Sequence, residues 1–175
     1  VTLVPNNGQD STTVNETFDN AYENTLAVVP SRDGYDFAGW FLDEAFANGI
    51  TATTKVKTAT AHNAYANWTA HTYTVSFDKN IGYDTTVPDS VTYEYDQIDE
   101  SGNLPTLPAM TGTVEGYTFL GWNTDKDAKV KLYDDQAEVS NWTTVDGDVI
   151  TLYAIWEANK YAVSYDINYV GGSNP

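Results

Sequence analysis

Two histidines and three small acidic clusters are the side chains of this sequence best suited to acid-base chemistry or metal binding. Neither His62 nor His71 has a second histidine or a cysteine at ligand spacing, so we interpret both as surface residues. The acidic clusters are Asp125–Asp127, Asp134-Asp135 and Asp146–Asp148. They lack the spaced Asp/Asn-Gly pattern with a distant Glu that builds a calcium loop. With no phosphate loop or nucleophile elbow either, the sequence predicts no catalytic, metal-binding or cofactor-binding residue.

Aromatic side chains offer a second kind of chemistry, which is stacking on the faces of sugar rings. Trp142 stands outside the repeated motifs of the chain, because Thr54 occupies the matching position in the other half. An aromatic residue without a repeated counterpart is the best candidate for an exposed binding platform. We therefore expect any ligand contact at Trp142, alone or together with Tyr83 or Tyr133.

The composition excludes several classes of function. A formal net charge of -17, from 25 acidic and 8 basic residues, repels phosphates, which argues against nucleic acid and anionic membrane surfaces as partners. There is no cysteine, so disulfides and zinc-thiolate sites are impossible. No apolar run approaches the roughly 20 residues of a membrane helix, so membrane insertion is not expected. The chain begins at Val1 rather than at a methionine, and we expect it to be a piece of something longer.

A repeated aromatic motif organises the chain. Gly34–Trp40 and Gly116–Trp122 share the pattern Gly-Tyr-x-Phe-x-Gly-Trp, and each copy is followed by a second motif that ends in tryptophan. Residues needed once per repeat are typical of a folding core, and the inner glycine is expected to let the backbone bend before the tryptophan. The predicted core residues are Tyr35, Phe37, Gly39, Trp40, Trp68, Tyr117, Phe119, Gly121, Trp122 and Trp156.

The repeat divides the chain into two small domains and the start of another. We assign residues 1–70 to the first unit and residues 71–160 to the second unit, which has longer loops. Residues 161–175 are predicted to begin a truncated third repeat with its opening strand. The joints between units are short and equal in length, so neighbouring units should form a semi-rigid string.

The local sequence pattern favours strands. Apolar and polar residues alternate in Val75–Gly82 and again in Val149–Trp156, which is typical of half-buried or central strands. Only Asp19–Ala27, Asp43–Asn48 and Asp134–Asn141 have some helical character. The predicted fold class is therefore β-rich α+β, with mostly strands and at most a short helix in each unit.

These motifs together resemble the Listeria-Bacteroides repeat family, also called the internalin B-repeat. The resemblance lies in the Gly-Tyr-x-Phe-x-Gly-Trp motif, the closing Thr151–Trp156 segment, and the Tyr-x-Val-x-Phe/Tyr openings at Tyr73–Phe77 and Tyr161–Tyr165. It implies tandem β-grasp-like domains in secreted or wall-anchored bacterial proteins, often adhesins, where they serve as stalk or interaction modules. It implies no catalytic residue.

The sequence supports two functions as hypotheses. The first is a non-catalytic tandem repeat module of a secreted or cell-surface bacterial protein, acting as a semi-rigid stalk or adhesin segment. Its partners would be neighbouring repeats and a host or cell-surface protein or glycan. The alternative is a carbohydrate-binding module attached to a glycan-active enzyme, which requires exposed and roughly coplanar rings around Trp142.

Overall fold

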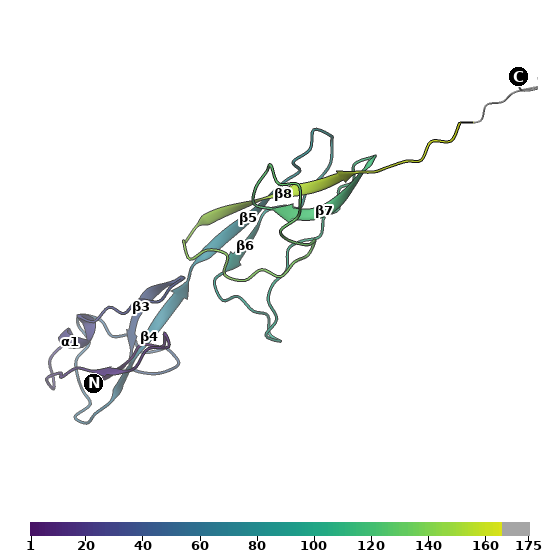
Figure 1. The fold of residues 1–175 in the computed structure, drawn as a ribbon. Coiled ribbons are helices and arrows are strands. Elements are labelled where there is room, and N and C mark those ends of the chain that lie inside the picture. The colour runs from purple at the N-terminus through teal and green to yellow at the C-terminus, as the bar shows by residue number, and fades with distance from the viewer. Residues whose placement is uncertain (166–175) are drawn as a thin grey trace, which may run out of the picture.

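The computed structural model describes residues 1–165 and contains two four-stranded sheets. The sheets lie end to end, so the molecule is elongated (Figure 1). Each sheet has its own cluster of buried hydrophobic side chains. The prediction of a strand-rich chain with very little helix is confirmed.

The first sheet is built from residues of the predicted first unit. Its strands are β1 (Thr2–Val4), β2 (Thr12–Thr13), β3 (Tyr35–Phe41) and β4 (Asn63–Ala70), in the order β2-β1-β4-β3. The outer pairs β1/β2 and β3/β4 are antiparallel, whereas the central pair β1/β4 is parallel. A parallel pair requires a long crossover between its strands, and here β3 and its flanking loops provide it.

The second sheet repeats this plan with longer strands. It contains β5 (Thr72–Asp78), β6 (Val91–Glu94), β7 (Tyr117–Asn123) and β8 (Asp148–Ala158), in the order β6-β5-β8-β7. The central pair β5/β8 is again parallel, and both outer pairs are antiparallel. The two copies of the aromatic motif therefore occupy the same edge position, on β3 and β7.

The first of the three stretches with predicted helical character contains α1 (Glu23–Leu26), the one α-helix of the described residues. The other two stretches are turns. In Asp43–Asn48 the Asp43 carboxylate accepts hydrogen bonds from backbone N–H groups of its own turn, and Phe46 has a φ of 55°. Gln136 likewise has a φ of 58° within the third stretch. A left-handed residue interrupts a right-handed helix, which explains both differences.

A bulge separates the two halves of each aromatic motif. The register of β3 with β4 shifts between Phe37 and Gly39, and that of β7 with β8 shifts at the matching place before Gly121. The two glycines have φ values of 115° and 140°, which side-chain-bearing residues rarely adopt. After the bulge, Trp40 and Trp122 are 2% and 0% exposed. The bulge thus directs the side chain of one tryptophan into each core.

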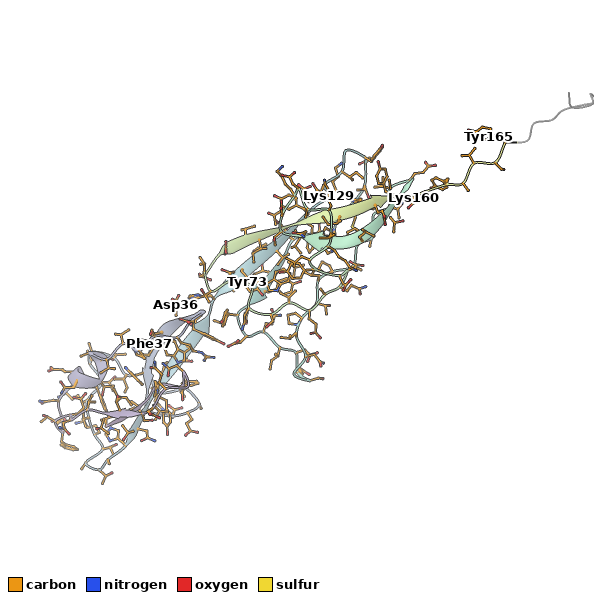
Figure 2. All side chains as sticks on the ribbon, viewed as in Figure 1. Asp36, Phe37, Tyr73, Lys129, Lys160 and Tyr165 are labelled. Atoms are coloured by element: carbon orange, nitrogen blue, oxygen red, sulfur yellow. The ribbon has the colours of Figure 1, made fainter. Side chains whose placement is uncertain are left out.

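The predicted opening of the third repeat is only partly described. Tyr161, Val163 and Tyr165 lie in no strand and are 74%, 72% and 88% exposed. Figure 2 shows Lys160 and Tyr165 beyond the end of β8. The rest of the predicted third repeat, residues 166–175, lies outside the described residues.

Candidate functional site

The repeated phenylalanines and tryptophans build the interior of each unit, whereas Tyr35 and Tyr117, also predicted as core residues, belong to neither hydrophobic cluster. Phe37 lies between Trp40 and Trp68, with both ring-centroid distances at 5.5 Å. In the second unit Phe119 lies 5.0 Å from Trp122 and 5.4 Å from Trp156. Such edge-to-face and tilted contacts add to the free energy of burying the rings. These residues are occupied by packing and do not form an open binding surface.

The closing tryptophans also fasten the loop that follows each opening strand. The indole N–H of Trp68 donates to the carbonyl of Pro5 at 2.8 Å. The indole N–H of Trp156 donates to the carbonyl of Lys79, also at 2.8 Å. The polar edge of each ring is therefore used inside its own unit.

The three candidate ligand-contact aromatics do not form one platform. Trp142 and Tyr133 stack on each other at 4.5 Å with an interplanar angle of 22°. Both are half-buried and pack against the core cluster of the second unit. Tyr83 is 53% exposed and packs instead beside Tyr117, with ring centroids 5.4 Å apart.

His62 and the acidic clusters serve local structure. His62 Nε2 and the Tyr22 hydroxyl are 2.9 Å apart. Asp125 and Asp146 accept backbone N–H groups, from Asp127 and Thr72 respectively, at 2.9 Å each. Among residues 1–165, no three His, Asp or Glu side chains are grouped so that they could hold a metal ion.

The most elaborate polar arrangement lies where the two units meet. A single residue, His71, separates β4 from β5. Its backbone N–H donates to the Gly34 carbonyl of the first unit at 2.8 Å, and its carbonyl accepts the Tyr95 N–H of the second unit at 2.8 Å. The backbone of His71 thus belongs to both units at once, and we call this contact region the junction.

An aromatic ring covers the junction on one side. A Cβ placed on Gly34 would lie 2.5 Å from carbon atoms of the Tyr95 ring. Only a residue without a side chain allows this approach. The Tyr95 ring also meets Tyr35 edge-on, with ring centroids 5.7 Å apart. A glycine of the repeated motif therefore also allows an aromatic ring of the next unit to pack against the backbone.

One carboxylate collects polar groups from both units. Asp96 accepts hydrogen bonds from the Tyr35 hydroxyl at 2.8 Å and from the Asn141 amide at 2.6 Å. The Arg32 guanidinium lies 3.3 Å from it and stacks 3.7 Å above the Tyr35 ring. The hydrogen bond from Asn141, followed by that from Tyr35, lowers the pKa of Asp96 below its usual value. Burial and then the hydrogen bond to Asp96 raise the pKa of Tyr35.

The His71 side chain spans the same boundary. Its Nδ1 lies 2.6 Å from the Thr144 carbonyl of the second unit, and its Nε2 lies 3.2 Å from Asp36 of the first unit. Figure 2 shows Asp36 at the end of the first sheet that faces the second sheet, near Tyr73. Both ring nitrogens face acceptors, so only the doubly protonated imidazolium can donate to both. The Thr144 carbonyl, and then Asp36, raise the pKa of His71.

The sequence contains a signal for this region, but the signal is ambiguous. The equal, short joints predict restricted motion between units, yet the isolation of His71 from other ligand residues indicates only a surface position. An aromatic residue followed by Asp occurs at Phe18-Asp19 and again at Tyr95-Asp96, after the second strand of each unit. No residue pattern within one unit reveals that this pair contacts the unit before it.

The junction is suited to holding two units in a fixed relation. An open cleft of about 400 Å³ lies beside it, lined by polar residues that include Asn7, Gln9, Arg32 and Asp96. Two carboxylates, Asp33 and Asp96, line this cleft, and that of Asp96 already accepts hydrogen bonds from Tyr35 and Asn141. The contacts of the junction are those of an interface between structural units.

No helix within residues 1–165 has the length and apolar character needed to span a membrane.

Comparison with known proteins agrees with this repeated plan. The family model of the Listeria-Bacteroides repeat domain matches residues 1–67 and again residues 73–155. A protein of Evansella cellulosilytica named as a Gly-rich membrane protein is 36% identical over 152 residues, which are 85% of this chain and 15% of that protein. Internalin H of Listeria monocytogenes is 31% identical over 136 residues, which are 75% of this chain and 21% of the internalin.

The chain thus spans about a fifth or less of the length of these relatives. No solved structure matches it. Both stretches matched by the family model coincide with a four-stranded sheet and one copy of the aromatic motif. The chain therefore belongs to the Listeria-Bacteroides repeat family and carries the repeat twice.

Proposed function

We propose that this chain is a non-catalytic spacer, a semi-rigid stalk segment of a bacterial surface protein. The single observation that carries the proposal is the junction, in which one linking residue and the Tyr95–Gly34 contact join the two units. A flexible tether would show a polar Gly- or Ser-rich linker without such contacts. A stalk instead needs contacts that resist bending between units.

The division of the chain into domains, and the fold of each domain, are part of the same proposal. Residues 1–70 and 71–160 act as separate small domains, and residues 161–175 begin a third repeat. Support comes from the two separate hydrophobic clusters and from the exposed apolar side chains at Tyr161 and Val163. Each domain is β-grasp-like, a proposal supported by the mixed sheet with its central parallel pair and by the crossing segment that carries α1 in the first unit.

A surface location is supported by the names of relatives, one a Gly-rich membrane protein and another an internalin. Adhesion to a host or cell-surface protein or glycan is a second role that we propose for the longer protein. The carbohydrate-binding alternative has less support, because Trp142 and Tyr133 stack on each other rather than presenting coplanar faces. Titration of the intrinsic tryptophan fluorescence with cell-wall and host glycans tests it directly, and saturable quenching that W142A abolishes would establish it.

The stalk proposal is tested by a matched pair of glycine variants. Gly34 and Gly116 have φ values of 76° and 78° in equivalent turns, so alanine costs about 1–2 kcal/mol of local strain at either position. Only at Gly34 does the new Cβ also collide with a ring of the other unit. We expect ¹⁵N relaxation to show both units tumbling as one body in the native chain and in G116A. In G34A each unit should tumble faster and independently.

The outcome that contradicts the proposal concerns the native chain. If the two units of the native chain already tumble independently, and small-angle scattering shows a broad range of particle lengths, the stalk proposal is wrong. A further control separates ring collision from backbone strain. In a Tyr95→Ala background the ring is gone, so adding G34A should produce no extra loosening of the junction.

A further inference from the structure

The polar cleft beside the junction has walls from both units. It has a volume of about 400 Å³. Asn7, Gln9 and Asp33 are among the residues that line it from the first unit, and Tyr95 and Asp96 line it from the second. A ligand in this cleft would therefore contact two units at once.

Neighbouring repeats would leave this cleft open. A unit meets the one before it through an aromatic residue followed by aspartate, as the contacts of Tyr95 and Asp96 show. The matching pair of the first unit, Phe18 and Asp19, does not line the cleft. Gly116, the counterpart of Gly34 in the second unit, does not line it either.

Several polar groups of the lining residues have no hydrogen-bond partner within residues 1–165. These groups are the Gln9 Nε2 amide, the Ser31 hydroxyl and the Asp33 carboxylate. The hydrogen bonds of the Arg32 guanidinium are long, at 3.3 and 3.5 Å. The cleft therefore combines groups that only donate, a carboxylate that only accepts, and a hydroxyl that does both.

This polar lining is not a general feature of the repeat. Three of its residues are replaced by apolar or aromatic residues at the matching positions of the second unit. The pairs are Asn7 and Ile81, Gln9 and Tyr83, and Arg32 and Val114. Arg32 also supports the junction, whereas Asp33 has no partner within residues 1–165. Polar groups that neither folding nor the junction requires are suited to contacting a ligand.

The charges of the cleft select the kind of ligand. The carboxylates of Asp33 and Asp96 outnumber the guanidinium of Arg32, so a phosphate or a carboxylate would be repelled. A calcium ion needs about six to eight oxygen ligands, and Asp96 already accepts hydrogen bonds from Tyr35 and Asn141. An uncharged ligand rich in hydroxyl groups fits best, because each hydroxyl both donates and accepts hydrogen bonds.

We propose that this cleft binds one neutral sugar residue of a glycan. Its hydroxyl groups hydrogen-bond with Asp33 and Gln9 of the first unit and pack against Tyr95 of the second. The proposal names a site for the glycan adhesion proposed above. It also rests on the stalk function, because the walls of the cleft stay together only while the junction holds. The site is separate from Trp142, which does not line the cleft.

The test is an NMR titration of the ¹⁵N-labelled full chain with the methyl glycosides of glucose, galactose, mannose and N-acetylglucosamine. We expect at least one of them to produce saturable shifts at the Gln9 side-chain amide and at the backbone amides of Asp33, Gly34 and Asp96. The dissociation constant should be on the order of 1–10 mM, because the ligand is small and the cleft is open. Methyl glucuronide, which is negatively charged, should bind at least several-fold more weakly.

A matched pair of variants locates the binding. Asp33 and Glu115 are exposed, and each precedes the first glycine of its aromatic motif, but only Asp33 lines the cleft. D33A should weaken binding about tenfold or more, because a hydrogen bond to a charged group is lost. E115A should leave binding unchanged, and adding Q9A to D33A should weaken it further. ¹⁵N relaxation verifies that the two units still tumble as one body in each variant.

The proposal is overturned if none of the neutral glycosides gives saturable shifts at the cleft, or if D33A and E115A bind equally well. Tighter binding of the glucuronide than of the neutral glycosides would also overturn it, and would identify Arg32 as part of an anion site. If the chain tumbles as one body and binds none of these sugars, the inference fails and the stalk proposal stands. Independent tumbling contradicts the stalk proposal instead, so the two failures are distinct.

Discussion

The two units use the same buried tryptophan differently. The indole N–H of Trp40 donates to the Val28 carbonyl at 2.8 Å. Its counterpart, Trp122 Nε1, has no hydrogen-bond partner among the described residues and is fully buried. The crossing segment explains the difference. In the first unit, Val28 follows helix α1, whereas the second unit replaces the helix with the proline-punctuated stretch Leu104–Met110.

The two copies of the motif therefore share the position of the ring but differ in its hydrogen bond. Trp122 has more aromatic contact, since Phe77 lies 4.8 Å away and Phe119 lies 5.0 Å away. In the first unit the place of Phe77 is taken by Leu3. Ring packing can partly offset the cost of an unpaired N–H, which is about 1–3 kcal/mol.

The largest effect is expected from removing either ring. W40A and W122A should each cost about 3–5 kcal/mol of folding free energy, because each leaves a large cavity. Hydrogen exchange should show loss of protection in the mutated unit alone, since each unit has its own hydrophobic cluster. Loss of protection across both units from one substitution would mean that they fold as a single cooperative body.

A smaller difference is expected at the bulge glycines. A Cβ on Gly121 would collide with the Tyr133 carbonyl oxygen and the Lys131 side chain, whereas a Cβ on Gly39 meets only Phe41 at 4.0 Å. Both variants suffer positive-φ strain, but G121A should be more destabilising than G39A by about 1–3 kcal/mol, an overpacking cost. Chemical denaturation of the two variants measures the difference. Equal destabilisation would show that the Tyr133 loop moves aside freely.

The contribution of the Trp40–Val28 hydrogen bond is tested by the milder substitution of each tryptophan by phenylalanine. W40F and W122F remove similar ring volume, but only W40F leaves a former acceptor, the Val28 carbonyl, without its donor. We expect W40F to be more destabilising than W122F by about 1 kcal/mol. Denaturant melts of both variants provide the comparison. A larger loss in W122F would mean that its indole N–H is paired in solution.

The smallest effect concerns pH. It distinguishes His71, which follows the last strand of the first sheet, from Asn159, which follows the last strand of the second. His71 has a raised pKa, so its contribution to the junction is complete below its ordinary value of 6.5 and is lost as the pH rises through the raised value. Asp96 has a lowered pKa, so its contribution is present above 3.8 and is lost as the pH falls through the lowered value. Independent tumbling of the units should therefore increase as the pH rises through the pKa of His71 and as it falls through the pKa of Asp96.

The measurement is ¹⁵N relaxation as a function of pH, with H71A as the control. That variant should lose the alkaline change and keep the acidic one. Asn159, which does not titrate, occupies the matching position at the end of the second unit, so signals there should not follow the His71 transition. An alkaline transition that persists in H71A would assign it to another group.

The sequence is informative about the fold because its strongest signals are local and repeated. Alternation along Val149–Trp156 predicts a central strand, and β8 covers this stretch. The helical character of Asp43–Asn48 is misleading, because the sequence does not show that Asp43 closes a turn onto its own backbone. The third-repeat strand stays a prediction, since Val163–Tyr165 forms no strand and residues 166–175 lie outside the described part of the chain.

The candidate site is less predictable from the sequence. Gly34 is far along the chain from Tyr95 and Asp96, and they meet only because His71 links the two sheets directly. Such a contact depends on the relative orientation of two units, and no periodicity within either unit encodes that orientation. The repeat nevertheless contains one relevant signal. The aromatic motif begins with a glycine, and packing of the core does not explain why that position has no side chain.

The parallel central pair in each sheet determines how the molecule would respond to pulling. The chain enters the second unit along β5 and leaves it along β8, and these strands are paired from Tyr73 with Asp148 to Asp78 with Tyr153. Both strands run along the length of the molecule (Figure 1). Tension applied through the two ends therefore slides β5 against β8, and the hydrogen bonds between them share the load instead of opening one after another. β1 and β4 have the same parallel pairing in the first unit. Pulling on the two ends would therefore load both sheets in shear, the geometry in which the hydrogen bonds between the central strands break together.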